Sequence, residues 1–170
     1  MTKNFRIASF LWILGLPFAL AAPAASFEQK NLRGRLGVGF TNQIATTQDG
    51  TIPALSAKYY MSKSFATSLG FGFDTRSNPG STMAVGLKLY KNVFFEPQMI
   101  FYTGGGLGLV SRNGTKTQFA LFLGSEFFLA GLPSLGLSFE AGIRGDNTSG
   151  SFALRSIGDS FLTGGMHFYF

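Results

Sequence analysis

The sequence predicts an all-β protein, an eight-stranded antiparallel up-and-down β-barrel that follows a cleavable leader. Three observations predict this fold: alternation of apolar with polar or small residues over eight segments, connections that alternate between short and long, and an N-terminal stretch of the secretory type. Charged residues make up only 13% of the 170 residues, while Phe alone occurs 20 times. Too few charges remain to coat the surface of an ordinary soluble enzyme.

The leader is expected at residues 1–26. Lys3 and Arg6 form a positive start, an uncharged apolar stretch follows, and small-residue tripeptides suited to cleavage end at several points between residues 21 and 26. A retained transmembrane helix is the alternative, because the uncharged run is long enough to cross a bilayer. Prolines within the run favour cleavage instead, so we expect the mature domain at residues 27–170.

Period-two alternation marks the strands. In segment 81–90, Met83 and Leu87 fall on one face, while Gly86 and Lys88 fall on the other. Successive side chains of a strand point to opposite faces, so this spacing predicts β-structure. Eight such segments are expected, at about residues 32–42, 53–61, 65–74, 81–90, 94–109, 118–129, 135–144 and 152–170.

The connections alternate in length. Short turns are expected at residues 62–64, 91–93 and 130–134. Longer polar loops are expected at residues 43–52, 75–80, 110–117 and 145–151. Antiparallel strands of about ten residues with such alternating connections are typical of bacterial outer-membrane barrels.

The two strand faces decide between a membrane barrel and a soluble one. One face carries the large apolar residues, and the other carries most charges and many glycines. The pattern alone permits either orientation. The leader, the low charge and the glycine content favour a transmembrane barrel with the apolar face toward lipid, because glycine suits a narrow lumen better than a solvated strand. Closure then follows, since an open sheet edge in lipid would leave backbone groups unpaired.

Charged residues on the polar face are expected to form a luminal network. With a turn at residues 91–93, Lys88 lies opposite Glu96 and should form an ion pair with it. Glu126 and Glu140 lie near each other by similar counting and require a cation. The expected members of the network are Arg35, Lys58, Lys88, Glu96, Glu126, Glu140 and Arg144. An ion path or switchable gate is one interpretation; we favour a plug of paired charges, because buried charges must be paired whatever the function.

No catalytic, metal or cofactor site is expected. The chain has no Cys and a single His, which excludes thiolate and multi-His metal sites. His167 and Ser160 are roughly 23 Å apart along an extended strand, so no Ser–His pair forms within that segment. The basic residues follow no stripe, so no nucleic-acid partner is expected either.

The C-terminal segment carries a recognisable pattern at Thr163, Gly165, Phe168 and Phe170. This pattern of polar, glycine and aromatic positions resembles the assembly signal of outer-membrane barrels. With the leader and the eight segments, the whole mature chain resembles the small eight-stranded bacterial outer-membrane β-barrels of the OmpA transmembrane-domain, OmpX and OmpW type. The resemblance implies a place in the cell outer membrane with both termini in the periplasm. It also implies barrel-assembly machinery and periplasmic chaperones as partners during biogenesis.

The expected function is that of a non-enzymatic outer-membrane barrel, a monomer with a structural or surface-interaction role. Outer-membrane lipid and lipopolysaccharide are its expected partners. A narrow channel for ions or small solutes is the main alternative. A lipid-modifying barrel enzyme and a secreted soluble β-barrel are more distant ones.

Overall fold

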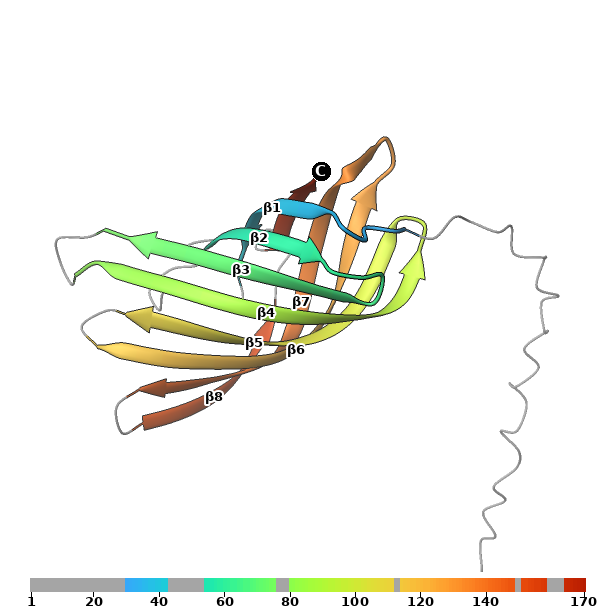
Figure 1. The fold of residues 1–170 in the computed structure, drawn as a ribbon. Coiled ribbons are helices and arrows are strands. Elements are labelled where there is room, and N and C mark those ends of the chain that lie inside the picture. Colours follow the sequence, from blue (N-terminus) through green and yellow to red (C-terminus); the bar gives the residue numbers. More distant parts are fainter. Residues whose placement is uncertain (1–29, 43–53, 76–79, 112–113, 149–150, 159–163) are drawn as a thin grey trace, which may run out of the picture.

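The computed structural model describes residues 30–42, 54–75, 80–111, 114–148, 151–158 and 164–170 (Figure 1). The predicted leader, residues 1–26, and the predicted loop 43–52 lie outside these residues. Among the described residues, no helix is long and apolar enough to cross a membrane.

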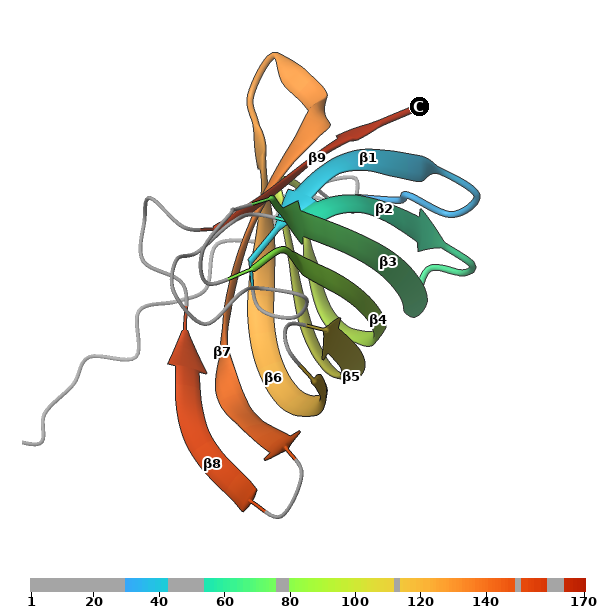
Figure 2. The ribbon, with the colours of Figure 1, turned by 90° about the vertical axis from the view of Figure 1, so that its left-hand side faces the viewer.

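The described residues form an antiparallel sheet that closes on itself (Figures 1 and 2). Its strands are β1 (Leu36–Thr41), β2 (Ala54–Tyr60), β3 (Phe65–Asp74), β4 (Thr82–Glu96), β5 (Met99–Ser111), β6 (Thr115–Leu129), β7 (Leu132–Thr148), β8 (Ser151–Gly158) and β9 (Gly165–Tyr169). Consecutive strands pair from β1 to β7, and β9 joins β7 to β1. The predicted closed up-and-down barrel is therefore confirmed.

Strands β8 and β9 share one position in the barrel. β8 pairs with residues 141–148 of β7, and β9 pairs with residues 135–138 of the same strand. The nine segments thus make the eight predicted barrel positions. The last segment, predicted as 152–170, is divided by residues 159–163, which lie outside the described chain.

The predicted turn at residues 91–93 is wrong. Strand β4 continues to Glu96, and the turn lies at Pro97 and Gln98, between the paired residues Glu96 and Met99. Proline lacks the N–H that a central strand needs, which favours a turn at this point. Asn92 instead lies within β4 and bonds to the connection between β2 and β3. Its backbone N–H donates to Ser64 O at 2.8 Å, and its side-chain amide donates to Lys63 O at 2.8 Å.

Two hairpins are longer than predicted. The expected loop at 110–117 contains the end of β5 and the start of β6, which pair as far as Ser111 and Thr115. The expected loop at 145–151 contains paired residues of β7 and β8 as far as Thr148 and Ser151. The strands therefore extend well beyond the predicted ends at this end of the barrel, named here the loop end. The opposite end, with its short connections, is named the turn end.

The first strand begins later than predicted, at Leu36 rather than residue 32. Gly34 has a φ of +77°, a left-handed conformation that suits glycine. The Arg35 N–H donates to Leu32 O at 2.9 Å, which closes a turn before β1. This turn buries the Leu32 side chain, leaving it 2% exposed at the turn end of the lumen.

Polarity is inverted relative to a water-soluble domain. Strand β4 alternates strictly from Thr82 to Asn92: its even-numbered residues are buried, and its odd-numbered residues, four large apolar side chains and Lys91, are exposed. Leu69, Leu89 and Leu121, on three different strands, are 56%, 57% and 61% exposed. The large apolar side chains therefore line the outer wall, as predicted.

Aromatic rings fill the turn-end half of the lumen. Tyr90 packs edge-on against Tyr102 at 5.1 Å and against Phe122 at 5.5 Å, and Tyr60 against Tyr169 at 5.7 Å. Toward the loop end, Ala54, Ala84 and Val110 form a separate apolar cluster. The lumen thus holds large and small side chains, as predicted, with the aromatic rings in its turn-end half.

Gly104 and Gly105 offer a matched test of this packing. A Cβ at Gly104 would stand 2.7 Å from the Phe122 ring and closer still to Leu89 O, while one at Gly105 would meet only Leu121 Cδ2, at 3.3 Å, and Ala120 O, at 3.4 Å. We expect Gly104→Ala to lower the free energy of unfolding by about 1–3 kcal/mol, and Gly105→Ala to change it by less than about 0.5 kcal/mol. Urea unfolding of the refolded proteins measures both. Equal losses would contradict the packing described.

Candidate functional site: the luminal ion pairs

Four of the seven predicted network residues lie inside the barrel. Lys58, Lys88, Glu126 and Glu140 are each at most 6% exposed, on β2, β4, β6 and β7 respectively. Arg144 is also directed inward, but near the loop end, where its Nε lies 3.1 Å from Asp146. The remaining two, Arg35 and Glu96, are exposed and take no part.

Glu126 accepts from three side chains inside the lumen. Its carboxylate has no exposed surface and lies 2.8 Å from the Lys58 ammonium. Two phenols also donate to it, Tyr60 at 2.5 Å and Tyr169 at 2.6 Å. Three donors from β2 and β9 thus converge on one carboxylate of β6. Donation from charged and phenolic groups offsets much of the cost of burying the negative charge.

The second ion pair joins Lys88 to Glu140. The two charged groups are 2.6 Å apart, and the same ammonium donates to Thr41 Oγ1 at 3.2 Å. The Tyr102 hydroxyl donates to the other Glu140 oxygen at 3.2 Å. This pair connects β4 with β7 across the lumen, as the first pair connects β2 with β6.

Aromatic faces surround the buried ammonium groups. Lys58 Nζ lies 4.4 Å from the Tyr90 ring centroid and 4.8 Å from that of Tyr102. Lys88 Nζ lies 5.2 Å from the Phe122 ring centroid. Cation–π attraction is stronger for desolvated ions. The rings that fill the lumen therefore also solvate its cations.

The predicted pairing of Lys88 with Glu96 is wrong. Lys88 lies opposite Gly106 in the register of β4 and β5, and Glu96 lies opposite Met99. An irregularity between Asn92 and Phe94 shifts the register by one residue. A bulge of this kind moves every later side chain to the other face, so Glu96 points away from the lumen.

Glycines provide the space for the network. A Cβ at Gly136 would stand 2.6 Å from Glu126 Oε1, and one at Gly124 would stand 2.9 Å from the Tyr102 ring. A Cβ at Gly37 would stand 2.5 Å from the Tyr169 ring. The phenols and carboxylates reach one another because neighbouring strands present no side chain at these points.

Sequence reasoning missed a contact between Ser56 and His167. His167 Nε2 lies 3.0 Å from Ser56 Oγ, and the residues are 111 positions apart. Gly39 of β1 lies opposite both of them in register. Gly39 was the signal in the sequence for this contact. It has no side chain, so it leaves space between the inward-facing residues of the strands on either side of β1. Both side chains are at most 5% exposed, and no carboxylate is among the described hydrogen-bond partners of the ring.

The turn end of the lumen is covered by apolar side chains. Leu32 and Phe128 pack in the aromatic cluster, and Phe95 packs against it. The ammonium of Lys30 lies 4.3 Å over the Phe128 ring and donates to Pro133 O at 2.5 Å. Burial, together with repulsion by Arg35, lowers the pKa of Lys30. The segment before β1 thus spans the opening and is held to the β6–β7 hairpin.

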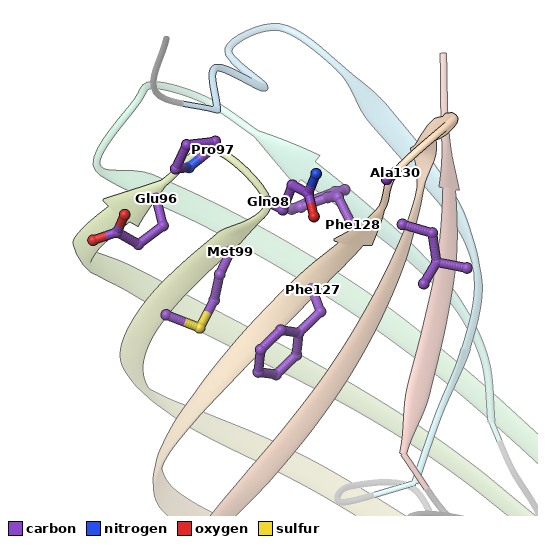
Figure 3. Close-up of a pocket in the computed structure, with 8 residues that line it drawn as sticks. Glu96, Pro97, Gln98, Met99, Phe127, Phe128 and Ala130 are labelled. Carbon is purple, nitrogen blue, oxygen red and sulfur yellow. The ribbon is translucent and has the colours of Figure 1, made fainter. Parts of the chain in front are cut away.

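Two grooves lie elsewhere on the described surface. One, of about 610 Å³, lies at the turn end between the β4–β5 turn and the end of β6, where Met99 and Phe127 face each other in register (Figure 3). The other, of about 410 Å³, lies on the outer wall beside Gly105 and is lined by apolar residues such as Leu107 and Leu121. The described residues contain no group of three or more His, Cys, Asp or Glu that could hold a metal ion.

Comparisons with protein-family models, with curated proteins and with solved structures find no match to this chain.

Double-mutant cycles distinguish the observed ion pair from the predicted one. We expect Lys88→Ala and Glu140→Ala to couple by at least about 1 kcal/mol in the free energy of unfolding, because each single change leaves a buried charge unpaired. The matched cycle of Lys88→Ala with Glu96→Ala should be additive within about 0.5 kcal/mol. Coupling in the second cycle and additivity in the first would overturn the register of β4 and β5.

Proposed function

We propose that this chain is an integral outer-membrane β-barrel, a monomer whose role is structural or surface-interacting rather than transport. The observation that carries the proposal is the inverted polarity of the barrel. Two full ion pairs, Lys58–Glu126 and Lys88–Glu140, lie inside, while leucine and phenylalanine side chains cover the outside. An apolar surface of this extent is costly in water and favourable in hydrocarbon.

Closure of the sheet supports the same proposal. Pairing of β6 with β7 and of β9 with β1 leaves no open edge along the turn-end half of the barrel. Backbone groups in a bilayer must find partners within the protein, and a closed barrel is one of only two structures that provide them.

The filled lumen argues against transport. Ion pairs tie β2 to β6 and β4 to β7, aromatic rings occupy the space around them, and Leu32 covers the turn end. A narrow channel remains the alternative function. It would require these ion pairs to separate, which leaves each buried charge without its partner.

A lipid-modifying enzyme is a second alternative, and the Ser56–His167 contact is the observation that favours it. A nucleophilic serine requires a base that a third group orients, together with access for substrate. Both side chains are buried and the described contacts supply no orienting carboxylate. We therefore assign this contact a structural role. A Ser56-dependent change in lipid acylation on overexpression would contradict that assignment.

The C-terminal pattern supports assembly by the outer-membrane machinery. Phe168 and Phe170 are 48% and 67% exposed on the outer wall, and Gly165 is buried. Thr163 lies outside the described residues. β9 is the strand that completes the ring between β7 and β1. Periplasmic chaperones during biogenesis, and lipopolysaccharide at the loop end, are the partners that this location implies.

Gel mobility tests location and fold together. We expect the protein in the outer-membrane fraction, and we expect the unboiled sample in SDS to migrate differently from the boiled one, because a closed barrel resists SDS at room temperature. Recovery in the soluble periplasmic fraction with no heat-dependent shift would mean that the chain is a soluble β-protein.

Conductance tests the filled lumen. We expect purified protein in planar bilayers to give no reproducible current steps, because the described charges are paired and the turn end is covered. A porin reconstituted in the same bilayers serves as the positive control. Reproducible open steps that scale with protein concentration would favour the channel alternative.

A further inference from the structure

The turn end of the barrel carries an unbalanced positive charge. Among the described residues there, the basic side chains outside the lumen are Lys30, Arg33, Arg35, Lys63 and Lys91. Glu96 is the exposed acidic side chain at this end of the described chain. The described ion pairs of the turn-end half lie inside the lumen, so the surface of this end of the barrel has a positive potential.

Lys91 shows how these cations are presented. It lies opposite Phe65 in register on the outer wall, and its Nζ is 4.2 Å from the Phe65 ring centroid. Phe65 is 48% exposed and Phe94, just beyond the bulge, is 62% exposed. The stem of such a lysine lies on apolar surface while its ammonium reaches the polar boundary.

Arg33, Arg35 and Lys91 form no ion pair with any described residue. All three are exposed. Their positive charges are therefore available to an external anion.

Exposed aromatic side chains mark one level of the outer wall near the turn end. Tyr59, Phe65, Phe94 and Phe168 are all more than 40% exposed near the turn end of the outer wall. Aromatic side chains of this kind mark the headgroup level of a bilayer. Lys91, which packs on the Phe65 ring, would then lie at the height of lipid phosphates.

The loop end differs in its described part. Asp146 forms ion pairs with Arg144, at 3.1 Å, and with Arg155, at 3.0 Å. Arg144 and Arg155 are thus paired within the protein, whereas Arg33, Arg35 and Lys91 at the turn end are not paired with any described residue.

We infer that the turn-end rim, with Arg33, Arg35 and Lys91, binds the phosphate groups of anionic phospholipids. This inference rests on the proposed function, because it needs the barrel to lie in a bilayer. It adds a ligand class and the residues that bind it, at the end of the barrel opposite the one assigned to lipopolysaccharide.

Lipid titration of the folded, delipidated protein in neutral detergent tests the inference, with binding counted by native mass spectrometry. We expect phosphatidylglycerol to bind more tightly than phosphatidylcholine. Lys91→Gln should weaken phosphatidylglycerol binding about fivefold, the effect of one charge near a lipid surface. The triple change Arg33→Gln, Arg35→Gln, Lys91→Gln should remove the preference for phosphatidylglycerol.

Two matched variants complete the design. Lys91→Arg keeps the charge and should keep the binding, and Lys116→Gln, on β6 at the loop end, should leave it unchanged. An equal loss in Lys116→Gln overturns the assignment to the turn end. A heat-modifiable protein without preference for phosphatidylglycerol overturns the inference and leaves the proposed function standing. Protein that shows no heat-modifiable band overturns both.

Discussion

A carboxylate without exposed surface must be neutralised where it lies, and Glu126 imposes that requirement on this barrel. Its donors come from β2, four strand positions away from β6 around the ring, and from β9, two positions away. They can meet only if the lumen is narrow enough for side chains to touch across it. Eight strands give such a lumen, whereas wider barrels leave a channel. The ion pairs thus depend on the strand number, and the filled interior depends on the ion pairs.

Glycine and aromatic residues fit together in this lumen. Gly104 leaves space for Phe122, Gly37 for Tyr169 and Gly136 for the Glu126 carboxylate. The high glycine content is therefore matched to rings and charges on neighbouring strands. The same rings stabilise the charges inside the lumen. Their cation–π contacts with Lys58 and Lys88 take the place of the water that would otherwise hydrate the ammonium groups.

Predictions of which face a side chain occupies succeeded in regular strands and failed at irregular points. Lys58, Glu126 and Glu140 point inward as their spacing predicts, because side-chain direction alternates as long as the ladder is unbroken. Glu96 points outward because a bulge precedes it. Arg35 lies before the first strand, after a turn at a left-handed glycine. Neither a bulge nor a turn before a strand changes the apolar pattern on which the predictions depend.

The sequence by itself determined the number of barrel positions, the inner and outer faces and the presence of a narrow lumen. These properties follow from the period-two pattern and the composition, which act over a few residues at a time. Only the tertiary structure decided the partners: Lys58 with Glu126, 68 residues away, and Ser56 with His167, 111 residues away. Such pairs depend on where the ring closes and on the register of every ladder between them. A single inserted residue changes that register, so no local pattern can specify the partner.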